Sequence, residues 1–121
     1  MNGCARAASA LTELVTRLGD ARRTLDRHSQ MPESDFGGEA GSVFRDGASR
    51  TADVLAAAAS DIALLAGALA RLGRELDAVH ELRRTAGSLP PQEAADVRRR
   101  VDQRERRAQA AWRSAVTRYD L

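Results

Sequence analysis

The side chains that could perform chemistry in this chain are few and far apart. Two histidines, His28 and His80, and one cysteine, Cys4, are the candidates for a nucleophile, a general base or a metal ligand. Cys4 has no histidine near it, and neither histidine has a neighbour at the spacing of metal ligands. The residues therefore predict no enzyme, no metal site, no cofactor and no small-molecule substrate.

Charged side chains are abundant but mixed in sign. The chain has 17 Asp and Glu residues and 19 basic residues, every one of which is Arg, and its formal net charge is +2. Acidic and basic residues alternate at helical spacing, which is typical of solvated helix faces that form salt bridges. A balance so close to neutral does not require a nucleic-acid partner.

The densest group of arginines lies near the C-terminus, where Trp112 and Tyr119 could stack on bases. Asp96, Asp102 and Glu105 dilute the group, so an exposed face of a bundle helix is the simpler interpretation. Nucleic acid is an unlikely partner, and contact with an anionic membrane or an acidic protein surface stays open. The arginines available for an anionic partner are Arg98, Arg99, Arg100, Arg104, Arg106 and Arg107.

An apolar seam runs through the middle of the chain and indicates helix packing as its main purpose. Apolar residues recur alternately four and three positions apart over about five heptads from Phe44 to Val79, interrupted only by Thr51, which predicts a helix that lies against other helices. A second periodic stretch, from Leu11 to Leu25, predicts a shorter amphipathic partner helix. The seam residues expected at a partner interface are Leu11, Leu14, Leu18, Leu25, Leu55, Ile62, Leu65, Leu69, Leu72 and Leu76.

These patterns predict an all-α fold, an antiparallel helical hairpin with a long second helix and a C-terminal third helix. We expect residues 1–89 to form the hairpin, with helices at about 4–28 and 39–86 and a turn at 29–38. Gly87 and the two prolines after Leu89 end the second helix. Residues 90–121 form the third, Arg-rich helix, which starts at Pro91.

The composition fits one soluble domain of 121 residues, 43% apolar and 30% charged. Aromatic residues make up 3% and alanine is the commonest residue, so we expect thin layers of closely packed helices. Asp53, Ser60, Asp61 and Arg71 interrupt the apolar stretch 52–72, which argues against a membrane span, and no cleaved signal peptide is evident. A cytoplasmic protein is expected.

The predicted turn carries a short motif, Phe36-Gly37-Gly38, followed by Phe44. This arrangement resembles the Trp-x-Gly (WXG, ESX-like) superfamily of small helical-hairpin proteins of type VII secretion, over roughly residues 5–86. Phe36 stands where the family has Trp, Gly38 at the family glycine and Phe44 at the following aromatic. We expect Phe36 to lie against the end of the hairpin or a partner, and Gly38 to permit a close backbone approach.

The resemblance implies that the chain is a partner or targeting subunit of a type VII secretion effector. In that role it would cover apolar helix faces of the effector, as a chaperone does, and could be exported without a cleaved signal peptide. The family's export signal, a Tyr followed four positions later by Asp or Glu, is absent after the hairpin, so a secreted partner would supply it. The partner is a helical domain of an effector, a related small protein or a second copy as a homodimer. The alternative is a nucleic-acid-associated or regulatory protein that uses the third helix.

Overall fold

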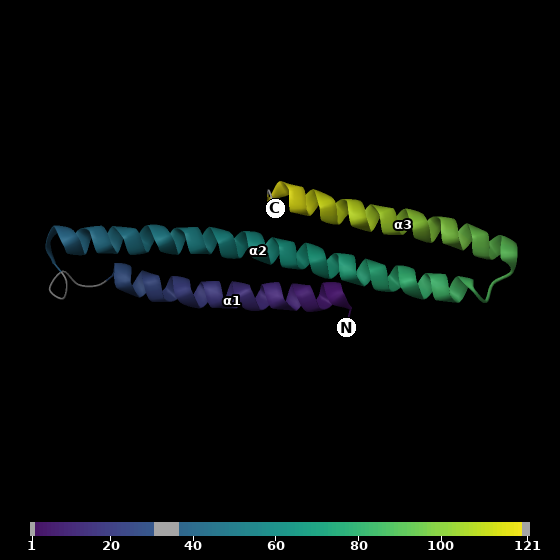
Figure 1. Cartoon of the computed structure of the whole chain (residues 1–121), viewed down its shortest axis with the longest axis horizontal. Helices are drawn as coiled ribbons and strands as arrows, with labels where there is room; N and C mark the ends of the chain where they lie inside the picture. The colour runs from purple at the N-terminus through teal and green to yellow at the C-terminus, as the bar shows by residue number, and fades with distance from the viewer. Residues whose placement is uncertain (1, 31–36, 120–121) are drawn as a thin grey trace. The chain divides into compact units, whose positions relative to one another are not determined.

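The structure, a computed structural model, describes residues 2–30 and 37–119 and consists of three α-helices (Figure 1). Helix α1 spans Gly3–Ser29, α2 spans Gly38–Ala86 and α3 spans Pro91–Arg118. No strand occurs in these described residues. The all-α prediction is confirmed, and the bounds of the first two helices fall within one residue of those expected.

The helix ends follow from local side-chain and backbone chemistry. Asn2 caps α1, because its Oδ1 accepts a hydrogen bond of 2.7 Å from the Ala5 backbone N–H. Gly38 opens α2 with a φ of 75°, a left-handed conformation that favours glycine. Pro91 occupies the first turn of α3, where its missing N–H costs no intrahelical hydrogen bond.

The chain divides into two compact units. Unit 1 comprises Met1–Ala10 and Leu64–Leu121, and unit 2 comprises Leu11–Ala63. Helix α2 contributes to both units, since the division falls between Ala63 and Leu64, and α1 divides after Ala10. Each unit is described separately below.

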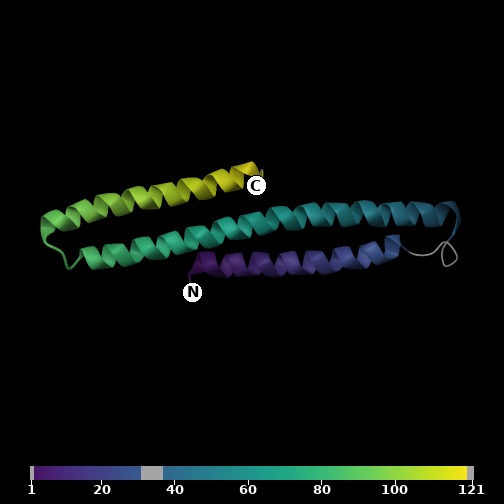
Figure 2. The same ribbon diagram turned by 180° about the vertical axis from the view of Figure 1, so that it is seen from behind.

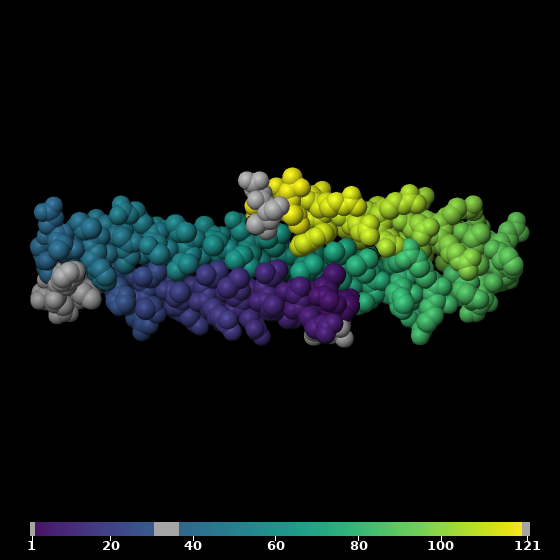
Figure 3. Space-filling view, in the orientation of Figure 1, coloured from purple at the N-terminus to yellow at the C-terminus, as the bar shows by residue number. Residues whose placement is uncertain are grey.

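Unit 1 contains the start of α1, the second half of α2 and the whole of α3. The ribbon views from both sides place α3 alongside this half of α2 (Figures 1 and 2), and the side chains of the two segments meet in the space-filling view (Figure 3). The buried side chains are small, and Val79 is the largest with under 2% exposure. The other buried apolar residues of this unit are Ala8, Leu65, Ala66, Ala68, Ala86, Ala94 and Val101.

The start of α1 packs closely against α2 at Gly73. A Cβ placed on Gly73 would lie 3.0 Å from the Cβ of Cys4. Asn2 Nδ2 also donates a hydrogen bond of 3.0 Å to the Gly73 carbonyl oxygen. The glycine therefore lets the start of α1 come directly against α2, which a larger residue would prevent.

Unit 2 contains the rest of α1 and the first half of α2. Its buried apolar side chains are Ala48 and Ala52, and Gly41 is also buried. Large apolar side chains remain exposed, among them Val43 at 62% and Val54 at 67%. Among the described residues of unit 2, the fully buried side chains are small, and several large apolar side chains are exposed while others are half-buried.

Candidate protein-interaction surfaces

The ten predicted seam residues differ widely in exposure. Leu65 is buried at 6%, while Leu14 is 40% exposed. The other eight are half-buried. The seam is therefore partly covered within one chain, and Leu14 is the seam position most open to a partner. The residues of intermediate exposure are Leu11, Leu18, Leu25, Leu55, Ile62, Leu69, Leu72 and Leu76.

The residues of the predicted turn motif are placed in part. Phe36 lies outside the described residues. Phe44 is 42% exposed, and its ring lies 6.0 Å from that of His28 with an interplanar angle of 60°. No described atom lies within 4 Å of a Cβ built on Gly38, so the positive φ at this position, and not a close approach, requires glycine.

Helix α2 carries an unusually exposed apolar stretch. By length and composition alone it is apolar enough to cross a membrane, yet only 17% of its most apolar 18-residue stretch is buried. A core helix of a soluble protein passes the same test, although such a helix is normally mostly buried. Much of this apolar surface is therefore free to contact something outside the chain.

Two ion pairs join α2 to α3 in unit 1. The Arg104 guanidinium donates hydrogen bonds of 2.6 and 3.1 Å to the two carboxylate oxygens of Glu75. Arg83 donates to Asp102 at 2.8 Å and also to Glu105. The bidentate geometry at Glu75 fixes the register of the helices more firmly than a single contact would.

These pairs shift the ionisation of their members in the expected directions. The hydrogen bond from Arg104 is the main cause that lowers the pKa of Glu75 below its ordinary value, with smaller contributions from Arg107 and Arg74. Hydrogen bonds to Asp102 and then Glu105 raise the pKa of Arg83. The hydrogen bond to Glu75 likewise raises the pKa of Arg104. Each pair is solvent-accessible, so its contribution to stability is small.

The six predicted arginines of α3 fall into two groups. Arg104 is bound to Glu75, and Arg99 is paired with Asp96 one turn earlier on the same helix. Among the described residues the other four make no salt bridge, and all four are exposed. The unpaired members are Arg98, Arg100, Arg106 and Arg107.

A series of hollows lies along one flank of the α2–α3 pair in unit 1, and we call it the flank groove. One hollow, of about 290 Å³, is lined by Leu82, Val97 and Val101, with arginines around it. Its arginines are Arg100, Arg104 and Arg107. The groove thus combines an apolar base with a strongly cationic edge.

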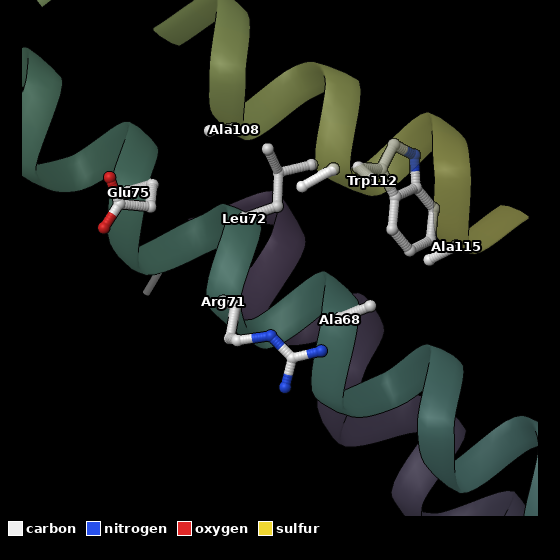
Figure 4. Close-up of a pocket in the computed structure, with 8 residues that line it drawn as sticks. Ala68, Arg71, Leu72, Glu75, Ala108, Trp112 and Ala115 are labelled. Carbon is white, nitrogen blue, oxygen red and sulfur yellow. The ribbon is translucent and has the colours of Figure 1, made fainter. Parts of the chain in front are cut away.

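We include in the flank groove two further hollows of about 210 and 200 Å³, which lie farther along the α2–α3 pair and share Ala68 and Arg71 of α2. Figure 4 shows the larger one, where the Trp112 ring of α3 lies near Ala115 and Leu72 points from α2 towards α3. The smaller one includes Leu64, Arg118 and Tyr119.

Seven of the eleven α3 residues that line the three hollows recur alternately three and four positions apart, a heptad pattern that suits a groove holding one further helix. The heptad-related α3 lining residues are Val97, Arg100, Arg104, Arg107, Ala111, Ser114 and Arg118.

The candidate chemical groups are dispersed in the described part of the chain. Cys4 is half-buried against Gly73, and it is a free thiol. His28 contacts Phe44, while His80 is exposed on α2. Residues 2–30 and 37–119 contain no cluster of three His, Cys, Asp or Glu side chains that could hold a metal ion.

Sequence reasoning did not identify the residues that join the helices of unit 1. Glu75 and Arg104 lie 29 positions apart, so no local pattern connects them. The N-cap role of Asn2 was also not predicted, although an Asn directly before a helix is a common cap residue. Its second contact, to Gly73, depends on tertiary packing and has no sequence signature.

Comparison of the chain with family models, with curated proteins and with solved structures gave no match in any of the three.

Proposed function

We propose that this chain is a small helical protein-interaction module whose apolar helix faces are completed by a helical partner. In this proposal α1 and α2 form an antiparallel hairpin and α3 folds back beside α2. The main support is the apolar stretch of α2, only 17% of which is buried in the single chain. Leu14, at 40% exposure, provides a matching open position on α1. A partner helix would remove this surface from water.

We further propose that the partner belongs to a type VII (ESX-like) secretion system, as an effector domain or a related small helical protein. This step depends on the resemblance of the Phe36-Gly37-Gly38 turn to the Trp-x-Gly motif. The left-handed φ of Gly38 supports it, because an L side chain at that position would be strained. The chain would then act in the cytoplasm as a targeting or chaperone-like subunit, exported together with its partner or remaining behind.

The proposal is tested by a matched pair of variants on α1. Leu14→Asp places a carboxylate at the exposed seam position, where binding would have to desolvate it. Thr16→Asp adds the same charge at an exposed position on the opposite face of α1. We expect the tagged wild-type chain, purified from its native host, to carry a bound helical protein. The Thr16→Asp variant should retain this protein, and the Leu14→Asp variant should lose it.

Folding controls accompany this experiment, since a misfolded chain would also lose partners. Both variants should keep the helical circular-dichroism signal and melting temperature of the wild type, because both sites are exposed. Leu65→Asp, by contrast, would test folding, since Leu65 is buried within the chain. Equal retention by Leu14→Asp and Thr16→Asp would contradict the proposed seam interface.

The alternative, nucleic-acid contact through α3, has the unpaired arginines in its favour. The carboxylates that bind Arg83, Arg99 and Arg104 weigh against it, because they neutralise part of the same helix pair. We expect only weak, salt-sensitive DNA binding. An affinity tighter than about 1 µM at physiological salt would favour the alternative.

A further inference from the structure

The flank groove carries positive charge that the chain itself does not neutralise. Arg71, Arg100, Arg107 and Arg118 line it, and none of them makes a salt bridge among the described residues. Glu75 is the acidic side chain lining it, and that carboxylate is already held by Arg104. The groove therefore suits an occupant with both apolar and acidic side chains.

The first half of α2 carries a surface of this complementary kind, which we call the acidic strip. It contains Val43 and Val54, the two most exposed large apolar residues of the described chain. Asp46, Asp53 and Asp61 accompany them, and all three are exposed without a salt bridge among the described residues. One exposed arginine, Arg50, lies on the same face, so the carboxylates outnumber it three to one. Exposed valines on a face with an excess of unpaired carboxylates are the chemistry that the flank groove requires.

The spacings of the two surfaces agree. Asp46 and Asp53 are seven residues apart, as are Arg100 and Arg107, so each pair spans about 10.5 Å along its helix at 1.5 Å per residue. Val43 and Val54 are separated by about 16.5 Å on the same scale. That separation matches two successive apolar hollows of the groove, one at Val97 and the next at Ala108, which also lie eleven residues apart.

We propose that the flank groove of one copy binds the acidic strip of a second copy of this chain. Made reciprocally, the contact closes a two-fold dimer. A duplex nucleic acid could satisfy the arginines but not the Leu82, Val97 and Val101 side chains between them, whereas the acidic strip satisfies both. The contact leaves the exposed seam position Leu14 free, but it uses Val43 and Val54 of the exposed apolar surface of α2 on which the proposed function rests. The Leu14→Asp variant therefore distinguishes the two proposals.

The test is a charge reversal with a matched control on α3. R100E/R107E reverses two groove arginines, and R99E/R106E reverses two exposed arginines with the same seven-residue spacing on the outer face. Sedimentation velocity should give the wild type and R99E/R106E a concentration-dependent mass approaching twice 13.0 kDa. For R100E/R107E we expect the dimer dissociation constant to rise about tenfold or more.

A swap on the acidic strip decides whether these two surfaces meet. D46R/D53R alone should also dissociate, whereas an equimolar mixture of D46R/D53R and R100E/R107E should recover the dimer, because each altered surface then faces one of opposite charge. Raising NaCl from about 50 to about 500 mM should weaken the wild-type dimer about tenfold. Circular dichroism checks that every variant remains helical.

Three outcomes would overturn the proposal: a wild-type mass of 13.0 kDa at all concentrations, equal loss in R99E/R106E, or no recovery on mixing. Tight DNA binding that R100E/R107E abolishes would assign the groove to nucleic acid instead. If Leu14→Asp loses its host partner but keeps the dimer, the partner interface and the dimer interface are different surfaces. The same conclusion follows if R100E/R107E loses the dimer but keeps the host partner.

Discussion

Units 1 and 2 use the same helix, α2, in different ways. In unit 1, α2 buries Val79 to 1% exposure and is joined to α3 by ion pairs at Glu75 and Arg83. In unit 2, the same helix leaves Val43 and Val54 more than half exposed. Unit 1 is stabilised by packing and ion pairs within the chain itself, whereas unit 2 exposes apolar surface that a partner can cover.

The largest expected effect contrasts one substitution in the two units. Val79→Asp places a carboxylate at a fully buried site of unit 1 and should lower the free energy of unfolding by about 3–5 kcal/mol. Val54→Asp makes the same change at a 67% exposed site of unit 2 and should cost less than about 1 kcal/mol. Urea unfolding followed by circular dichroism measures both. Similar losses in the two variants would remove the distinction between the units.

A second contrast concerns two glycines inside α2. Gly73→Val forces a side chain against Cys4 and should destabilise unit 1 by about 1–3 kcal/mol. At Gly47 nothing lies within 4 Å of the added Cβ, so Gly47→Val should change stability by less than about 0.5 kcal/mol. Thermal melts compare the two. If Gly47→Val is the more harmful variant, the close approach of α1 to Gly73 is refuted.

At the start of α2, Gly38→Ala should cost about 1 kcal/mol, because alanine is strained at a φ of 75°. The site is open, so the loss should be the same for alanine and for a larger unbranched residue such as Gln. Melting temperatures of the two variants distinguish strain from crowding. A much larger loss for Gln would indicate a close approach at this position after all.

The smallest expected effect is on pH dependence. The folded-state pKa of Glu75 lies below its ordinary value, so its stabilising contribution is present above about pH 4.5 and is lost as the pH falls through the lowered pKa. Glu75→Gln should therefore weaken the acid dependence of stability seen in the wild type. Glu81→Gln, which removes a pair with Arg84 inside one helix, is the control and should have less effect. Equal acid profiles for wild type and Glu75→Gln would show that this pair does not stabilise unit 1.

The helices could be predicted because their signals are local. Apolar periodicity together with Gly87 and Pro91 predicted the bounds of the first two helices and the start of the third, and the structure agrees to within one residue. The contacts between helices could not be predicted, because pairs such as Glu75 and Arg104 depend on register, which no single segment encodes. The need for glycine at Gly38 was expected, but its physical cause in the structure is the backbone conformation.

The candidate surfaces were predictable to different degrees. The heptad spacing identified the seam, but only the structure separates the exposed Leu14 from the buried Leu65. The arginines of α3 were evident from composition, yet which of them are bound depends on Glu75 of α2, which pairs with Arg104, and on Asp96 of α3, which pairs with Arg99. The flank groove has no sequence signal, since it is formed by two helices together.

The central claim, that a single chain leaves apolar helix surface for a partner, is tested most directly by the mass of the species purified with the tagged chain from its native host. The measurement uses light scattering in the R100E/R107E background, which removes association through the flank groove. We predict a mass well above 13.0 kDa that falls to 13.0 kDa when Leu14→Asp is added and persists with Thr16→Asp. A mass of 13.0 kDa without either addition would contradict the account.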